Sequence, residues 1–462
     1  MMTRNQRFCL IQFLSLLLLA CLSSTPGTPA QPALQASVSP ASRPSPLPSP
    51  DPAALIQPSD LIYLGAFRLP EAPAGTPENA GWEWSGHALT YYPDGDPKGS
   101  NDGFPGSLFG TGNNQTQYVS EISIPAPVIS AGKNLAELPI ATTLQGFHNI
   151  RGNLFRGVEG FSDYAGTLAK AGLAYLPRLG GQTTGKLYFA FGYHLQQVPQ
   201  VEPTLHGSPE VSHGWIDLNL TSARPAGAWK IGDYINFVTS DYLFPIDPTW
   251  AQMYTRGKLL ATGRFRDGGQ GSQGPSLFAI GPWNEGNPPP PGASLDALPI
   301  LAYTNILDPQ THTLNGYSHA DDWTGGAWLV SGNRSAVTFA GTKASGKTWY
   351  GFQNGVVWPE EPPFPQPGPG ERGWWADRFE AQIIFYDPAD LAAVARGIIP
   401  SWQPQPYAVL SLAPYLYHVK STQVRYQVGD IAFDAQHGFI YVMELLVDAD
   451  KPIIHVFKIR ES

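Results

Sequence analysis

The feature of this sequence that most constrains its fold is a set of short β-rich segments that recurs along the chain after residue 60. A glycine-led run of small apolar residues opens four of the sets, at 86–91, 172–175, 326–329 and 429–433. A second run follows at 107–110, 186–189, 258–261, 336–339 and 438–441. A third closes most sets, at 119–124, 214–218, 276–280, 382–386 and 454–459. Helical periodicity is scarce apart from 390–396, so the sequence predicts an all-β fold.

The recurrence predicts a β-propeller, because sheets repeated radially leave only short, protected edges. We expect five blades, with six or seven as the alternatives, in a single domain that spans residues 59–462. The run at 61–67 is expected to pair with the C-terminal strands and close the ring. A pair of β-sandwiches would need a linker between two domains, and no second Pro/Ser-rich boundary interrupts the body.

The composition agrees with this class of fold and excludes others. Hydrophobic residues make up 42% of the chain and aromatic residues 12%, whereas charged residues make up only 14%. That balance can bury a large core and disfavours helical bundles, coiled coils and helical solenoids. The formal charge is −9 and becomes −11 without Arg4 and Arg7 of the N-terminal segment, which disfavours nucleic acid as a partner.

The N-terminal segment has the pattern of a signal peptide. Arg4 and Arg7 precede an uncharged apolar run at 8–20, which is too short to span a bilayer. The run ends in Leu-Leu-Ala-Cys at 18–21, which resembles the lipobox of bacterial lipoproteins. The resemblance implies removal of residues 1–20, acylation of Cys21 and attachment to a membrane of the cell envelope. An ordinary secretory leader that is cleaved a few residues later is the alternative, and the protein would then be secreted.

Residues 21–58 are predicted to form a tether between the lipidated cysteine and the domain. Ten prolines and only two charged side chains lie between 22 and 58, so this segment should be semi-extended and unpacked. Cys9 and Cys21 are the only cysteines of the sequence. The domain therefore has no disulfide, no thiolate zinc site and no cysteine nucleophile.

Three short motifs resemble ligand-binding loops but do not fit their context. Residues 341–348 match the P-loop pattern, yet 349–352 continue as a strand where a helix is required, so no nucleotide is expected. Residues 269–274 match a dinucleotide pattern but join two strands. Residues 94–99 begin like a calcium loop, although Lys98 occupies a ligand position, and a hairpin turn is the better interpretation. The sequence does not decide whether the channel binds a cation, and it identifies no cofactor.

Topology predicts the functional site better than these motifs do. In a propeller, the segment before each innermost strand and the loop after each second strand emerge on the same face and converge around the channel. We expect Glu83 and Asp322 to be the paired catalytic carboxylates, with His87 and His194 as further catalytic candidates. The candidate ligand-binding residues on the same face are Trp84, Tyr193, Arg264, Arg266, Asp267, Trp323 and Lys343.

Each of these residues also has a purely structural interpretation. Glu83 and Asp322 could be hydrogen-bonded loop carboxylates, and His87 and His194 could be structural histidines. Arg264 and Arg266 share one face of a strand and could clamp a carboxylate or sulfate, or pair with Asp267.

Three functions fit this set of residues. The most concrete is a glycoside hydrolase with paired carboxylates, in which Trp84 and Trp323 stack on sugar faces. The chain resembles five-bladed glycosidase propellers in outline. The alternatives are a non-catalytic propeller that binds a glycan or protein outside the cytoplasm, and a polysaccharide lyase that acts on an anionic glycan.

Overall fold

The computed structural model describes residues 54–461 with internal gaps. The gaps are 156–167, 180–181, 194–210, 223, 235–237, 267–272, 284–287, 304–311, 360–362, 364–371 and 418–424. The chain divides after Pro46, and all described residues belong to the second unit. The signal peptide, Cys21 and most of the tether therefore lie outside the described residues.

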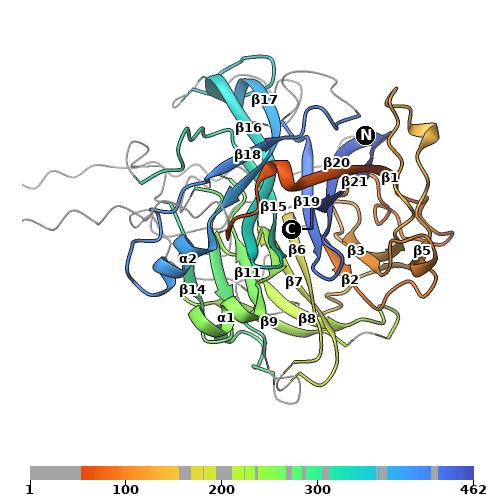
Figure 1. Ribbon diagram of the computed structural model, residues 1–462, viewed down its shortest axis with the longest axis horizontal. Coiled ribbons are helices and arrows are strands. Elements are labelled where there is room, and N and C mark those ends of the chain that lie inside the picture. Colours follow the sequence, from red (N-terminus) through yellow and green to blue (C-terminus); the bar gives the residue numbers. More distant parts are fainter. Residues whose placement is uncertain are drawn as a thin grey trace, which may run out of the picture. The chain divides into compact units, whose positions relative to one another are not determined.

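The described residues form five antiparallel sheets, and Figure 1 shows them arranged around a common centre. Blade 1 contains β2 (Leu89–Tyr92), β3 (Ser107–Thr111), β4 (Val119–Ser123) and β5 (Thr143–His148). Blade 2 contains β6 (Leu168–Leu176), β7 (Lys186–Tyr193), β8 (His213–Asp217), β9 (Ala226–Ile231) and a short parallel strand, β13 (Ser294–Leu295). Blade 3 contains β10 (Tyr242–Pro245), β11 (Leu260–Gly263), β12 (Leu277–Ile280) and β14 (Leu298–Leu301).

The last two blades hold the longest strands and the closure of the ring. Blade 4 contains β15 (Asp322–Ser331), β16 (Arg334–Gly351), β17 (Gly373–Tyr386) and β18 (Ala408–Ser411). Blade 5 contains β19 (Val428–Asp434), β20 (Phe439–Asp448), β21 (Lys451–Ile459) and β1 (Leu61–Arg68). The innermost strands contact one another in the order β2, β6, β10, β15, β19 and back to β2. The prediction of a five-bladed propeller is confirmed.

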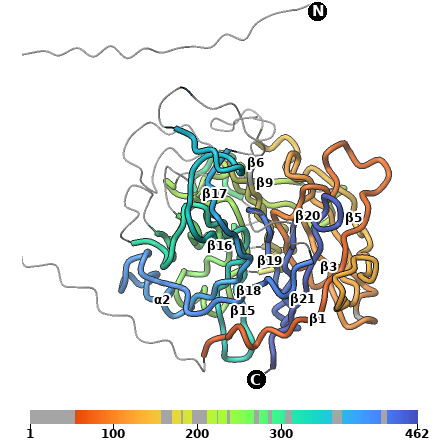
Figure 2. The backbone as a smooth tube through the Cα atoms, turned by 90° about the horizontal axis from the view of Figure 1, so that it is seen from above, coloured from red at the N-terminus to blue at the C-terminus, as the bar shows by residue number. Residues whose placement is uncertain are grey.

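The ring is closed by the N-terminal strand, as the sequence predicts. β1 pairs antiparallel with β21, from Leu61 opposite Ile459 to Arg68 opposite Ile453. Figure 2 shows β1 and β21 side by side, close to the C-terminus. Residues at opposite ends of the described chain therefore share one sheet.

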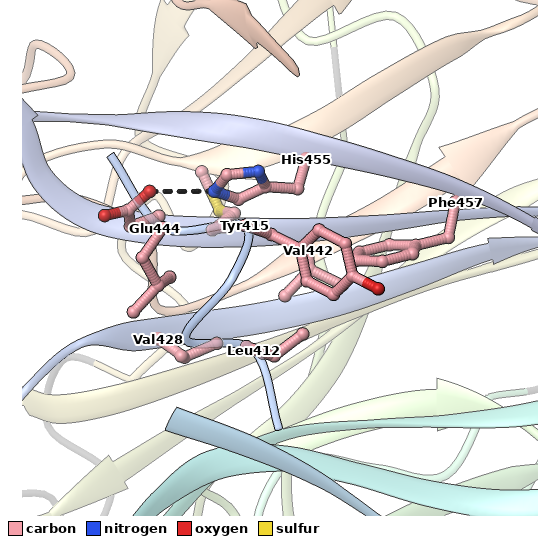
Figure 3. Close-up of a pocket in the computed structure, with 9 residues that line it drawn as sticks. Leu412, Tyr415, Val428, Val442, Glu444, His455 and Phe457 are labelled. Carbon is pink, nitrogen blue, oxygen red and sulfur yellow. Dashed lines mark hydrogen bonds and ion pairs between the residues drawn. The ribbon is translucent and has the colours of Figure 1, made fainter. Parts of the chain in front are cut away.

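A chain of polar contacts lies at this closure, and Figure 3 shows its buried pair, Glu444 and His455. Nε2 of His455 is 2.8 Å from a carboxylate oxygen of Glu444, and Nδ1 of His455 is 3.0 Å from the hydroxyl of Tyr63. Both Glu444 oxygens accept the N–H of Tyr417. The space between these residues leaves no room for a water molecule. These contacts therefore fix β1 against β20 and β21 and offer no ligand site.

Glycine opens the innermost strands because neighbouring blades crowd the axis. A Cβ on Gly172 would lie 2.4 Å from the backbone of Tyr242 and Leu243 in the next blade. A Cβ on Gly429 would lie 2.1 Å from the carbonyl oxygen of Gly86. Contacts this short are sterically forbidden, so the glycine-led pattern of the sequence is a packing requirement.

The helices are short and begin where the sequence provides caps. α1 (Pro248–Tyr254) follows Asp247, and α2 (Pro388–Ala395) follows Asp387; both aspartates accept a backbone N–H of the first turn. The structure also describes the 3-10 turns η2 (Pro58–Asp60), η3 (Gly99–Asn101) and η4 (Leu135–Glu137). Within the described part of the chain, no helix has the length and apolar character needed to cross a membrane.

The structure also places the motifs that resemble ligand-binding loops. β16 runs through the whole P-loop match at 341–348, and Lys343 pairs with Glu380 of β17. A P-loop needs a helix at this point, so the match has no phosphate-binding geometry. Residues 94–99 form a turn in which Asp96 accepts the N–H of Lys98. The glycine-rich stretch at 269–274 falls largely outside the described residues.

Candidate anion-binding site

The N-terminal ends of the innermost strands bring charged residues from four of the five blades to one face. Lys170 is on β6, Asp241 immediately precedes β10, Asp322 begins β15 and Asp430 is on β19. Each of these four side chains is 3% exposed or less. We call this face the mouth of the channel.

Three cations from different parts of the chain surround Tyr426 at the mouth. Nζ of Lys170 lies 5.5 Å from the centre of the Tyr426 ring, and Cζ of Arg425 lies 5.0 Å from it. Nη1 of Arg266 is 3.4 Å from the Tyr426 hydroxyl. Tyr426 and Arg266 are half-buried, so the group opens to solvent at these two residues.

Asp241 and Arg264 form a buried ion pair below this group. Nη1 of Arg264 is 3.2 Å from Oδ2 of Asp241, and the same oxygen accepts the N–H of Phe265. Burial raises the pKa of Asp241, and the charges of Arg264, Arg266 and Lys170 oppose that shift. Nε of Arg264 donates to the carbonyl of Arg266, which ties the Arg264 side chain to the backbone two residues on.

Asp322 is paired with a cation and withdrawn from solvent. Its Oδ2 lies 3.5 Å from Nε of Arg425, and its side chain is 2% exposed. The neighbouring Trp323 is 1% exposed and packs in the hydrophobic core beside β10 and β15. A ring buried to this degree presents no face to a sugar, so the role expected for Trp323 does not fit its position.

His87 lies beside Lys170 and has a defined tautomer. Nζ of Lys170 is 3.2 Å from Nδ1 of His87. An ammonium group can only donate, so Nδ1 accepts and the neutral ring carries its proton on Nε2. Burial and the charge of Lys170 lower the pKa of His87 well below 6.5. His87 is therefore a neutral hydrogen-bond donor and a poor general base.

The described part of the mouth holds both cations and carboxyl groups. Lys170, Arg264, Arg266 and Arg425 are the cations, and Asp241, Asp322 and Asp430 are the carboxyl groups. Burial raises the pKa of Asp430 well above 3.8. Its carboxyl group accepts hydrogen bonds from the backbone N–H groups of Ile431 and Leu89, and these bonds lower the pKa in part.

An aromatic arm extends from blade 4 beside the mouth. β16 and β17 continue beyond the rest of their sheet and project at the top of Figure 1. Arg425 of the mouth lies 5.6 Å from the ring of Trp375 on this arm. At the base of the arm, Lys343 pairs with Asp321 at 2.8 Å.

The arm presents stacked rings and an exposed guanidinium. The Trp374 ring stacks on His319 with 4.4 Å between ring centroids and meets the edge of Tyr350 at 5.5 Å. Cζ of Arg372 lies 4.4 Å from the centre of a Trp358 ring. Trp374, Tyr350 and Trp358 are all half-buried, so each keeps part of its surface accessible.

Glu83 and Trp84 lie on the mouth face, but they contact other residues than Asp322 does. The N–H of Trp84 donates to the carbonyl of Asp450 at the β20–β21 turn, and the Trp84 side chain is 49% exposed. Glu83 is half-buried beside Gly81. No hydrogen bond or ion pair joins Glu83 to Asp322 in the described structure.

The structure thus brings together His87, Arg264, Arg266 and Asp322 of the predicted site. Tyr193 ends β7, but its side chain is outside the described set, as are His194, Asp267 and Cys21. Sequence reasoning missed Lys170, Asp241, Arg425, Tyr426 and Asp430. Lys170 and Asp430 could have been found by searching for charged residues within two positions of the glycine that opens an inner strand. Within the described ranges, no group of three or more His, Cys, Asp or Glu side chains is arranged to hold a metal.

Comparison with known proteins gives a distant structural similarity. No family model matches the chain, and no curated protein matches it significantly. Among solved structures, it is similar to the β-propeller domain of Cps50 (Swd1) from Myceliophteria thermophila. That similarity has 9% identity and a TM-score of 0.22 and covers 84% of this chain and 99% of the other. The assignment of five blades rests on the strand pairing.

Proposed function

We propose that this protein binds an anionic carbohydrate, one that carries uronate or sulfate groups, at the mouth of its channel. The observation that carries the proposal is the convergence of Lys170, Arg266 and Arg425 around Tyr426. An anion bound beside Tyr426 would lie near all three cations, and charge attraction is stronger in a partly desolvated site than in water. Guanidinium groups also match the geometry of carboxylate and sulfate oxygens.

The aromatic arm supports a carbohydrate over a small inorganic anion. Sugar rings present C–H faces that pack on indole and phenol rings. Trp374 and Tyr350 provide such surfaces, and Arg425 connects the arm to the mouth through its contact with Trp375. An extended anionic glycan could therefore contact both regions, with its charges at the mouth and its ring faces on the arm.

A glycoside hydrolase is less well supported by the contacts. Such an enzyme uses two carboxyl groups about 5 to 10 Å apart, one of them as a proton donor. Asp322 is buried against Arg425, and no hydrogen bond or ion pair of the described residues joins it to Glu83. The mouth has the composition of an anion-binding site more than that of a paired-carboxylate centre.

A polysaccharide lyase that acts on the same ligand is the second candidate. The contact between Arg266 and the Tyr426 hydroxyl favours it. In that reaction a base removes the proton on the carbon next to the uronate carboxylate, the C–O bond on the adjacent carbon breaks, and the leaving oxygen takes up a proton. The product has a new C=C bond. In this reaction Tyr426 would act as the base, and Arg266 would hold the uronate carboxylate.

We also propose that the protein acts outside the cytoplasm, held to a membrane by a lipidated Cys21. The charged start, the apolar run at 8–20 and the Leu-Leu-Ala-Cys sequence support this location. Metabolic labelling with a fatty-acid analogue tests it, because a Cys21→Ser variant should lose the label.

Calorimetric titration of the purified protein with defined oligosaccharides tests the binding function. We expect oligogalacturonate or a sulfated oligosaccharide to bind, cello-oligosaccharides of equal length to bind weakly or not at all, and added salt to reduce the affinity. Ultraviolet absorbance of an unsaturated uronate product, followed in the same samples, would show lyase activity.

Two arginine variants provide the matched comparison. Arg266→Gln should lower the affinity for the anionic ligand at least tenfold, because one charge-assisted contact is lost. Arg460→Gln removes an exposed arginine near the C-terminus, outside the mouth, and should bind like the unmodified protein. Equal binding of neutral and anionic ligands, or equal affinity of both variants, would contradict the proposal.

A further inference from the structure

A cavity opens at the other ends of the innermost strands. It has a volume of about 430 Å³ and is lined by residues of all five innermost strands and the segments that follow them. The residues of the mouth lie at the N-terminal ends of these strands, whereas the cavity is lined by their C-terminal halves. We call it the lower cavity.

Each blade contributes one aromatic side chain to the lower cavity. These are Tyr91 of β2, Tyr175 of β6, Phe244 of β10, Trp328 of β15 and Phe433 of β19. Leucine, proline and alanine side chains fill much of the remaining wall. A concave site of this size with aromatic walls has the usual character of a small-molecule pocket.

Three polar side chains of the wall, those of Thr90, Asp247 and Asp434, already have hydrogen-bond partners within the protein. Oγ1 of Thr90 accepts the N–H of Tyr175, and Asp247 caps α1 by accepting the N–H of Trp250. Asp434 accepts two backbone N–H groups and the Nδ1 proton of His437. The wall therefore offers water few partners, although a stably bound water needs two to four of them.

We propose that the lower cavity binds an uncharged apolar molecule of about two or three rings. An engineered apolar cavity of about 150 Å³ takes up one benzene molecule, and the lower cavity is nearly three times larger. Release of poorly hydrogen-bonded water and burial of carbon surface would drive binding. The inference is independent of the glycan site, because the two use different ends of the strands.

The test uses N-phenyl-1-naphthylamine, an uncharged probe whose fluorescence rises in apolar surroundings. We expect saturable binding of one probe per protein. Val330→Trp narrows the cavity and should weaken the affinity at least tenfold. Val409→Trp makes the same change at an exposed position on β18, outside the cavity lining, and should leave the affinity within twofold.

A second variant keeps the test valid if Val330→Trp fails to fold. Leu179 lines the cavity and is 40% exposed, so Leu179→Trp should fold and should also weaken probe binding. Circular dichroism confirms the fold of each variant. Probe binding without saturation, or equal affinity of the cavity variants and Val409→Trp, would overturn the inference.

Discussion

Charged side chains stay buried at the mouth because most of them have a partner that was buried with them. Asp241 has Arg264 and the N–H of Phe265, and Asp322 has Arg425. Removing one partner leaves a desolvated charge behind, which costs far more than the loss of an exposed pair.

An alanine at position 241 therefore tests the buried pair. Asp241→Ala should lower the free energy of unfolding by about 3 kcal/mol or more. Asp296 pairs with Lys258, but its side chain is 85% exposed, and Asp296→Ala should cost less than about 1 kcal/mol. Urea denaturation of both variants measures the difference. Similar losses for the two would mean that Arg264 finds another partner.

The sequence identified some members of this site and missed others for a physical reason. Arg264, Arg266, Asp322 and His87 lie next to recognisable strands, so topology placed them at the mouth. Arg425 and Tyr426 precede β19 in a segment with no strand periodicity, and no pattern connects them to Arg266, which is distant in sequence. Convergence of this kind depends on three-dimensional packing that periodicity does not encode.

At the scale of single elements, the glycine-led strands could be predicted from the sequence, whereas one of the two short helices could not. β2, β6, β15 and β19 carry the glycine pattern, whereas β10 begins at Tyr242 without a glycine and went unrecognised. α2 was expected near 390–396 and spans Pro388–Ala395, but α1 was not expected. A helix of two turns has too few residues for periodicity to be visible, so its Asp-Pro start is the stronger signal.

α2 carries a carboxyl group that should make stability depend on pH. Burial, and then the charge of Asp387, raise the pKa of Asp390 to about 6. Because the folded pKa is above the unfolded value, the proton stabilises the fold at low pH, and this contribution is lost as pH rises from about 4 to 6. Asp390→Asn should therefore gain about 1 kcal/mol relative to the unmodified chain at pH 7 and nothing at pH 4. Thermal melts at the two pH values measure this, and an equal effect at both would contradict it.

The aromatic arm gives a prediction for ligand binding. Trp374→Ala removes a ring that an oligosaccharide would stack on, so affinity for the anionic glycan should fall about fivefold to tenfold. Trp402→Ala removes a half-buried tryptophan that stacks on His312, away from the mouth, and serves as the control. Calorimetry compares the two variants. Unchanged affinity in Trp374→Ala would mean that the glycan does not contact the aromatic arm.

At the scale of the whole domain, the fold depends on closure of the ring by β1. Without β1, β21 would expose an unpaired edge, and Phe67, which is fully buried, would leave the core. Antiparallel pairing of residues near 61 and 459 was predictable, since a propeller without closure has two open edges.

Truncation separates the tether from the closure strand. A chain that starts at residue 47 keeps every described residue and should fold with the stability of the unmodified protein. A chain that starts at residue 69 lacks β1 and should aggregate or unfold at a lower temperature. Size-exclusion chromatography and thermal melts compare the two. Equal stability would mean that another segment closes the ring.

The net charge of the whole chain bears on how the cations of the mouth would act. The chain carries a formal charge of −9, so it repels polyanions at long range, and an anionic glycan must be recognised through local contacts. A crystal structure of the protein with an oligogalacturonate is the most direct test. The account predicts a uronate carboxylate in hydrogen-bonding distance of Arg266 and beside Tyr426. A ligand seated away from the mouth, or none at saturating concentration, would contradict it.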